Sequence, residues 1–126
     1  MENGIDISSL RPGLRSIGLS NINLSIVIVN YKSWKVLTEC LDSFNQYTPE
    51  LNYEIIVVDN DSQDGEIGSF SEKYPQVNFI KNTGNNGFAH GCNLGADNAY
   101  GKYLLFLNPD TVLTNSTAID LSLIHI

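Results

Sequence analysis

The sequence predicts an α/β protein with a mostly parallel sheet and helices that alternate with the strands. Short apolar runs recur along the chain, and segments of about 10–15 residues with helical periodicity separate them. The runs at residues 55–58 and 103–107 are rich in β-branched residues or leucine, and both stop abruptly at polar stretches that contain carboxylates. We interpret both as strands buried on both faces. The alternation indicates right-handed βαβ units and therefore a parallel sheet.

The first third of the chain predicts a leader, a strand and a helix. Residues 1–23 are rich in Gly, Ser, Asn and Arg without a clear period, and we expect them to be loosely ordered. Residues 24–29 predict a strand. Ser33 is placed to cap a helix that runs to about Gln46. The apolar stripe of this helix follows the spacing i, i+3, i+4, i+7 and consists of Leu37, Cys40, Leu41 and Phe44.

The remaining elements continue the alternation. The sequence predicts strands at 53–58, 77–80 and 102–107, a helix at 65–73 with Ile67 and Phe70 turned inward, and a helix at about 89–99. A polar loop rich in Gly and Asn, residues 81–87, precedes that last helix. Gly91 and Gly95 are four residues apart, so one helix face permits close packing against the sheet.

The end of the chain does not complete this pattern. The αβ alternation stops after the last predicted strand, and the apolar residues 121–126 provide neither a cap nor a closing strand. We therefore expect a truncated domain over residues 24–120, followed by a tail that is foreign to it.

Composition limits the possible partners. The chain has 126 residues, enough for one domain, and no apolar run approaches the roughly 20 residues that span a bilayer. Net charge is −7, without a basic patch, so we expect no nucleic acid partner. The isolated Cys40 and Cys92 predict buried thiols in a reducing compartment. Few cations are available to neutralise a bound diphosphate, and backbone amides and a divalent cation would have to do so.

The acidic stretch 59–66 follows the second predicted strand. A carboxylate at such a strand end can accept a hydrogen bond from the ring N–H of uracil or thymine, and we assign this contact to Asp59. The alternative is an Asx turn that caps the next helix, where acids are favoured by the helix dipole. We prefer the turn and cap for Asp61, Asp64 and Glu66.

Two further segments could meet a ligand. Asn108-Pro109-Asp110 follows the last strand and offers oxygen ligands for Mg²⁺ or Mn²⁺, although the same residues are good turn chemistry. In the segment 82–95, Gly84 and Gly87 permit a close approach of the backbone to a ligand. The segment is neither a phosphate-binding P-loop nor a dinucleotide fingerprint. Tyr31 could lie against a base or simply be a packed aromatic residue. We expect Trp34 to pack in the core and His90 to lie on the helix surface.

Taken in order, these motifs resemble one family. They are SIVIVNY at 25–31, IVVDNDS at 56–62 with Asp64-Gly65 after it, NTGNNGFA at 82–89 and LFLNPDT at 105–111. They resemble the front half of a family 2 glycosyltransferase with the GT-A fold, a Rossmann-like nucleotide-binding half. The Asn-Pro-Asp form is similar to the rhamnosyltransferase-like branch. The resemblance covers about residues 24–120.

The resemblance implies a function and a site. The donor would be a nucleotide-diphosphate sugar, dTDP-rhamnose or a UDP-sugar, and transfer would invert the anomeric carbon. The acceptor would be a cell-surface polysaccharide or another glycan or lipid-linked acceptor, and the protein would lie in the cytoplasm or at the inner face of the membrane. Mg²⁺ or Mn²⁺ would bind mainly to Asp110, because Asn108 replaces the family's first acid. The implied donor contacts are Asn30, Tyr31, Asp59, Asn60, Asn86, Gly87 and Asn108.

The resemblance also implies what is missing. The family's general base comes from the second half of the domain, so no residue of this chain is assigned to it. We therefore expect the chain alone to bind the donor without turnover.

Two other classes stay open on sequence grounds. A nucleotidyltransferase would normally carry a Gly-rich, Lys- or Arg-bearing loop after the first strand, and residues 30–34 have none. A non-catalytic nucleotide-binding or receiver-type module would also place acids at strand ends. A receiver requires in addition a lysine at the end of a later strand.

Overall fold

The computed structural model describes residues 22–84 and 87–114. Its core is a parallel four-stranded sheet of order β3-β2-β1-β4. The elements are β1 (Leu24–Asn30), α2 (Trp34–Gln46), β2 (Tyr53–Asp59), α3 (Glu66–Lys73), β3 (Asn78–Lys81), α4 (Phe88–Asp97) and β4 (Tyr103–Leu107). Nearly all of the predicted leader, and the whole predicted tail 121–126, lie outside the described residues.

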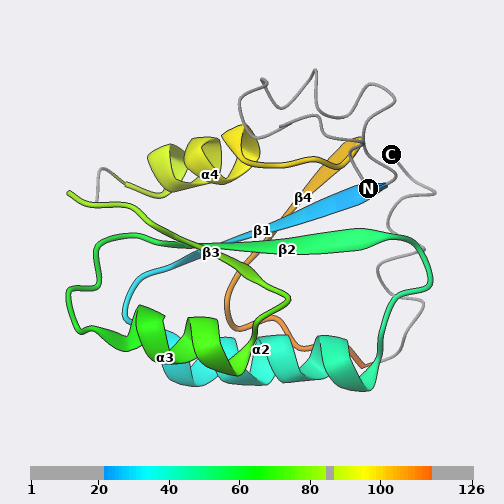
Figure 1. Cartoon of the computed structure of the whole chain (residues 1–126), viewed down its shortest axis with the longest axis horizontal. Coiled ribbons are helices and arrows are strands. Elements are labelled where there is room, and N and C mark those ends of the chain that lie inside the picture. The colour runs from blue at the N-terminus through cyan, green and yellow to red at the C-terminus, as the bar shows by residue number, and fades with distance from the viewer. Residues whose placement is uncertain (1–21, 85–86, 115–126) are drawn as a thin grey trace, which may run out of the picture.

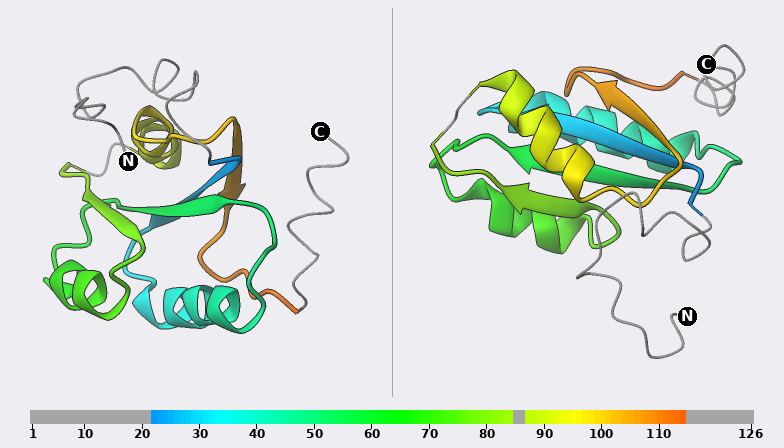
Figure 2. Two further views of the ribbon diagram at one scale, coloured as in Figure 1. Left: turned by 45° about the vertical axis from the view of Figure 1, so that its right-hand side comes forward. Right: turned by 90° about the horizontal axis from the view of Figure 1, so that it is seen from above.

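The predicted α/β alternation is confirmed. Each element begins and ends within two residues of its expected position. Helices α2 and α3 cover one face of the sheet and α4 covers the other, which gives three layers (Figures 1 and 2). Within the described ranges, no helix is long and apolar enough to cross a bilayer.

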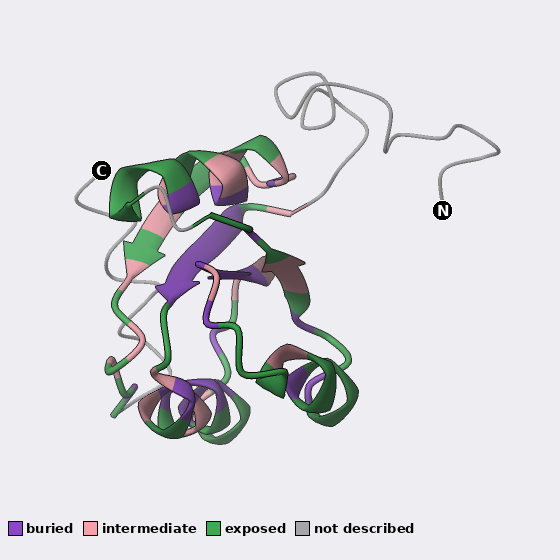
Figure 3. Ribbon diagram, turned by 90° about the vertical axis from the view of Figure 1, so that its left-hand side faces the viewer, coloured by how far each residue is buried: buried purple, intermediate pink, exposed green. Residues whose placement is uncertain are grey.

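The main core lies between the sheet and α2 with α3. The four residues of the predicted α2 stripe are all buried, and β1 is buried along its whole length (Figure 3). Trp34 packs as predicted, with its ring centroid 4.6 Å from that of Phe70. Ser33 occupies the N-cap position of α2 as predicted, but its side chain makes no capping hydrogen bond, and its hydroxyl donates to the carbonyl of Tyr31.

The two glycines of α4 bring this helix close to the sheet, as predicted. A Cβ on Gly95 would lie 2.4 Å from Val27 Cγ1, and one on Gly91 would lie 3.0 Å from Val29 Cγ1. Any larger residue would push α4 away from β1 and β2. The two glycines therefore set the distance between α4 and these two strands.

One burial prediction is wrong. The run 103–107 forms β4 but is not buried on both faces: Tyr103, Leu104 and Phe106 are 49%, 40% and 45% exposed. Among the described strands, β4 pairs only with β1 and forms an edge of the sheet. Helix α4 packs mainly on β1 and β2, and residues of β4 are coloured as exposed or intermediate in Figure 3.

A hydrogen-bonded clamp aligns β4 at the amino ends of the strands. Glu54 Oε2 accepts hydrogen bonds from the Ser25 hydroxyl at 2.5 Å and from the Tyr100 N–H at 2.6 Å. The Gly101 N–H donates to Ser25 Oγ at 2.8 Å. A Cβ on Gly101 would lie 2.6 Å from the Ser25 backbone nitrogen, so only glycine permits this approach. The clamp fixes the register of β4 on β1.

Candidate functional site

The candidate site lies at the carboxyl ends of the strands, on either side of β1. From β1 the chain passes through α2 to β2 on one side, whereas β4 lies on the other side and is reached through α4 across the opposite face (Figure 1). Such a reversal of strand order leaves a ligand crevice in open α/β sheets. Asn30 ends β1, and Asn108 and Asp110 follow β4, so these predicted site residues lie at the same edge of the sheet.

Asp59 is a buried acceptor at the end of β2, with 3% of its surface exposed. Its Oδ1 accepts hydrogen bonds from Asn30 Nδ2 at 3.1 Å and from the Ser62 hydroxyl at 2.5 Å. Its Oδ2 accepts one longer bond, 3.3 Å, from the Ser62 N–H. A carboxylate has about four lone-pair positions, so Oδ2 has capacity for a further donor. Our sequence analysis did not assign Ser62 a role.

Asn30 offers a second acceptor. Its side chain is fully buried, and its Oδ1 has no hydrogen-bond partner among the residues that the structure describes. Because Nδ2 donates to Asp59, turning the amide over would bring two acceptors together. Buried polar atoms nearly always have a partner, and an orphaned one calls for an explanation such as a ligand or a water.

The loop before α4 is fastened to the end of β2. Asn60 Nδ2 donates to the Gly87 carbonyl at 3.1 Å, and Asn60 Oδ1 accepts from Asn82 Nδ2 at 2.6 Å. Asn60 and Gly87 were predicted to contact the donor, whereas the predicted Asn86 lies outside the described residues. Our sequence analysis did not single out Asn82, although a buried amide directly after β3 occupies the same sheet edge.

Of the other acids of the stretch, Asp64 makes a local turn bond to the Glu66 N–H, whereas Asp61 joins two loops and no side chain among the described residues caps α3. Asp61 Oδ2 accepts from the Gly84 N–H at 3.0 Å. Asp64 accepts from Trp34 Nε1 at 2.9 Å and from the Glu66 N–H at 3.3 Å, at the start of α3. These bonds join the loops after β1, β2 and β3.

Tyr31 lies at the same edge of the sheet as Asn30. It directly follows β1 and is 47% exposed, and the Lys32 Nζ lies 5.3 Å from its ring centroid. A half-exposed ring at this position can lie against a flat ligand. The backbone around it is unusual, since left-handed φ values gather at this sheet edge. They occur at Lys32, Asp61, Gln63, Gly65, Gly84 and Gly87.

Asn108 and Asp110 lie in a turn, and their side chains carry oxygen atoms that can bind a metal ion. The Thr111 N–H donates to the Asn108 carbonyl at 3.1 Å, and both side chains are exposed. The described residues contain no cluster of three or more His, Cys, Asp and Glu that could hold a metal alone. One carboxylate and one amide oxygen instead fit a hard cation that shares its ligands with substrate phosphates.

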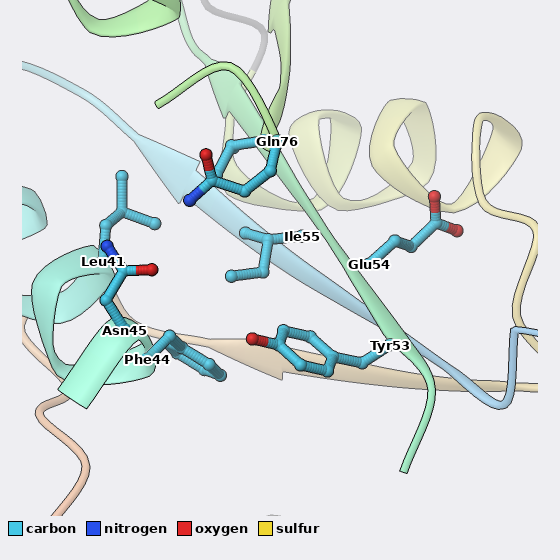
Figure 4. Close-up of a pocket in the computed structure, with 8 residues that line it drawn as sticks. Leu41, Phe44, Asn45, Tyr53, Glu54, Ile55 and Gln76 are labelled. Atoms are coloured by element: carbon cyan, nitrogen blue, oxygen red, sulfur yellow. The ribbon is translucent and has the colours of Figure 1, made fainter. Parts of the chain in front are cut away.

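The described residues also line hollows away from this edge of the sheet, and two of these lie beside α2. One, of about 260 Å³, lies between the last turns of α2 and the start of β2, where Phe44 and Tyr53 face each other with ring centroids 5.8 Å apart (Figure 4). The other, of about 420 Å³, lies between α2 and residues 112–114. Neither is lined by Asn30, Asp59 or Asp110, so neither belongs to the candidate site.

Comparison with known families gives one match over most of the chain. The model of glycosyl transferase family 2 matches residues 25–119. A poly(ribitol-phosphate) beta-glucosyltransferase of Bacillus spizizenii is 38% identical over 94 residues, which are 71% of this chain and 15% of that protein. The chain spans less than a third of the length of the curated relatives compared here.

Solved structures share the fold. Residues 1–349 of S. aureus TarS in complex with UDP match with a TM-score of 0.69 and 26% identity, over 81% of this chain and 31% of that one. A mannosyltransferase of Pyrobaculum calidifontis, in complex with GDP-Man and Mn²⁺, matches with a TM-score of 0.68 and 21% identity. That match covers 79% of this chain and 31% of the other.

Proposed function

Because this chain belongs to glycosyltransferase family 2, we propose that it binds the nucleotide-diphosphate sugar donor of an inverting transferase. The arrangement of the switch-point crevice supports the proposal. Base-reading acceptors lie at the ends of β1 and β2, and candidate metal ligands follow β4 on the other side of β1. A nucleotide diphosphate has the matching order of groups, with a base at one end and phosphates at the other.

The observation that carries the proposal is the Asn30–Asp59 pair. Asn30 Oδ1 is a buried acceptor without a partner in the described parts of the chain, and Asp59 Oδ2 has capacity to spare. Leaving a buried acceptor unsatisfied costs about 1–3 kcal/mol, which a ring N–H of uracil or thymine would remove. In this proposal Tyr31 lies against the base, while Asn60 and Gly87 hold the loop that borders the nucleotide.

In this proposal the residues after β4 bind the diphosphate end of the donor. Asp110, assisted by Asn108, would hold Mg²⁺ or Mn²⁺, and the ion would stabilise the leaving diphosphate as a Lewis acid. The exposed carboxylate and amide leave room for phosphate oxygens as the other ligands.

The names of relatives support a class of acceptor. One relative is a poly(ribitol-phosphate) beta-glucosyltransferase and another is a minor teichoic acid biosynthesis protein of Bacillus subtilis. We therefore propose that the acceptor is a cell-surface polymer or its lipid-linked precursor, and that the donor is a UDP-sugar or dTDP-rhamnose. The free thiols Cys40 and Cys92 favour the cytoplasm or the inner face of the membrane.

Nucleotide binding tests the proposal directly. The chain is titrated calorimetrically with UDP, dTDP and ADP in the presence of Mg²⁺. We expect UDP or dTDP to bind at least about tenfold more tightly than ADP, because the acceptor pair suits a pyrimidine imide N–H. Equal binding of ADP would contradict the base assignment, and absence of binding by all three would contradict the function.

A further inference from the structure

We propose that Lys32 binds the diphosphate of the donor, an inference that rests on the proposed function. The body of the chain is acidic and poor in cations, and the described residues hold five: Lys32, Lys35, Lys73, Lys81 and Lys102. A bound diphosphate therefore meets few side chains that can neutralise it, and the position of each lysine decides which one can.

The fold places the other four lysines less favourably than Lys32 for contact with the diphosphate. Lys73 ends α3 and Lys102 precedes β4, both at the amino ends of the strands. Lys81 ends β3, which β2 and β1 separate from β4. Lys35 lies in the first turn of α2, whereas Lys32 lies in the loop that joins β1 to α2, beside the switch point.

The backbone of Lys32 supports a function at this position. Its φ is +53°, in the left-handed region that side chains other than Asn, Asp and Gly rarely adopt. Its N–H donates to Ser62 Oγ at 2.8 Å, and that hydroxyl donates in turn to Asp59. Strain of this kind persists where the surroundings enforce it, and it gathers at functional sites. A lysine here costs stability that an asparagine would not.

The ammonium group is near the proposed ligand and only weakly held. The Lys32 side chain is exposed, and its Nζ lies 5.3 Å from the centroid of the Tyr31 ring. A cation–π contact at an exposed site is weak, whereas an ammonium–phosphate hydrogen bond is charge-assisted and short. The ammonium group can therefore leave the ring for a phosphate oxygen when a nucleotide diphosphate occupies the crevice.

The test separates charge from backbone strain. Lys32→Asn removes the charge and suits the left-handed backbone, Lys32→Arg keeps the charge, and Lys35→Asn is the matched control for loss of one nearby cation. Calorimetry with uridine and with UDP, both in Mg²⁺, distinguishes contacts to the base from contacts to the phosphates. Thermal melts of all variants record the stability.

We expect Lys32→Asn to bind UDP about tenfold more weakly and uridine unchanged, and at the same time to melt at a higher temperature. Lys32→Arg and Lys35→Asn should bind UDP within about threefold of the parent. Unchanged UDP affinity of Lys32→Asn would overturn the inference and leave the proposed function standing. Equal weakening for uridine and UDP, or a lower melting temperature, would also overturn it. A parent that binds neither UDP nor dTDP would instead contradict the proposed function.

Discussion

Asn30 and Asp59 are register partners at the ends of neighbouring parallel strands, and the Asn30 amide donates to the Asp59 carboxylate at 3.1 Å. This bond uses one N–H of the Asn30 amide and fixes the orientation of the side chain, so that its carbonyl oxygen is an acceptor. Asn30 Oδ1 and Asp59 Oδ2 therefore supply acceptor capacity at the ends of β1 and β2, which favours a ligand edge that carries an N–H donor.

The first prediction concerns this pair. Asp59→Ala should weaken the binding of UDP or dTDP about ten- to hundredfold, because a charged acceptor is lost. It should also lower the free energy of unfolding by about 1–3 kcal/mol, since Asn30 Nδ2 and the Ser62 hydroxyl lose their acceptor. Calorimetry and urea unfolding measure the two effects. Glu72→Ala, which removes an exposed acid of α3, is the control and should change neither.

The second prediction concerns the metal. With few cations at the crevice, binding of a nucleotide diphosphate should require Mg²⁺ or Mn²⁺. Asp110→Ala should abolish the metal dependence of UDP affinity, and Asn108→Ala should only reduce it. Calorimetric titrations with and without EDTA measure this. An affinity that EDTA leaves unchanged in the parent would contradict the metal assignment.

The third prediction concerns the register of β4. Gly101→Ala should destabilise the fold by about 1–3 kcal/mol, because the new Cβ meets backbone atoms of Leu24 and Ser25 that cannot move aside. Gly68→Ala is the matched control: its Cβ would meet nothing within 4 Å inside α3, and we expect a gain of about 0.5–1 kcal/mol. Urea unfolding compares them, and similar effects of the two substitutions would contradict the clamp.

The fourth prediction concerns alkaline pH. Burial raises the pKa of the Cys40 thiol from 9.0 to about 11, and the negative charge of Asp110 adds to the rise. A group whose pKa is raised on folding stabilises the fold fully below its unfolded pKa and loses that contribution as pH rises. The free energy of unfolding should therefore fall between pH 9 and pH 11. Cys40→Ala should show a shallower fall over this range, and an equally steep one would contradict the assignment.

Local patterns in the sequence predicted the elements well. Hydrophobic periodicity located the buried stripe of α2, and the four-residue spacing of Gly91 and Gly95 anticipated the closeness of α4 to β1. The exposure of Leu104 and Phe106 was not predictable in the same way. It depends on which strand lies at the edge and where α4 crosses, and both are properties of the strand order rather than of the run itself.

For the candidate site, too, the sequence predicted some residues and missed others. Polar residues after apolar runs located Asn30, Asp59 and Asp110 at one sheet edge. Two partners were missed: Ser62, whose hydroxyl donates to Asp59, and Asn82, whose amide donates to Asn60. Ser and Asn are common in any turn, and neither the bond from the Lys32 N–H to Ser62 nor that from Asn82 to Asn60 joins residues that are near in sequence. Ser33 was correctly placed at the N-cap of α2, but its side chain makes no capping bond and its hydroxyl donates to the Tyr31 carbonyl.

The clamp at the amino ends of the strands has a consequence for the order of folding. The Ser25–Gly101 bond closes a loop of 76 residues, whereas the Asn30–Asp59 bond closes one of 29. The longer closure costs roughly 0.9 kcal/mol more in chain entropy, and in the described sheet β4 gains a single neighbouring strand in return. We therefore expect β4 to join the sheet last and its amides to exchange with deuterium first. The acceptors for the base would then be assembled on the folding pathway before the ligands for the metal.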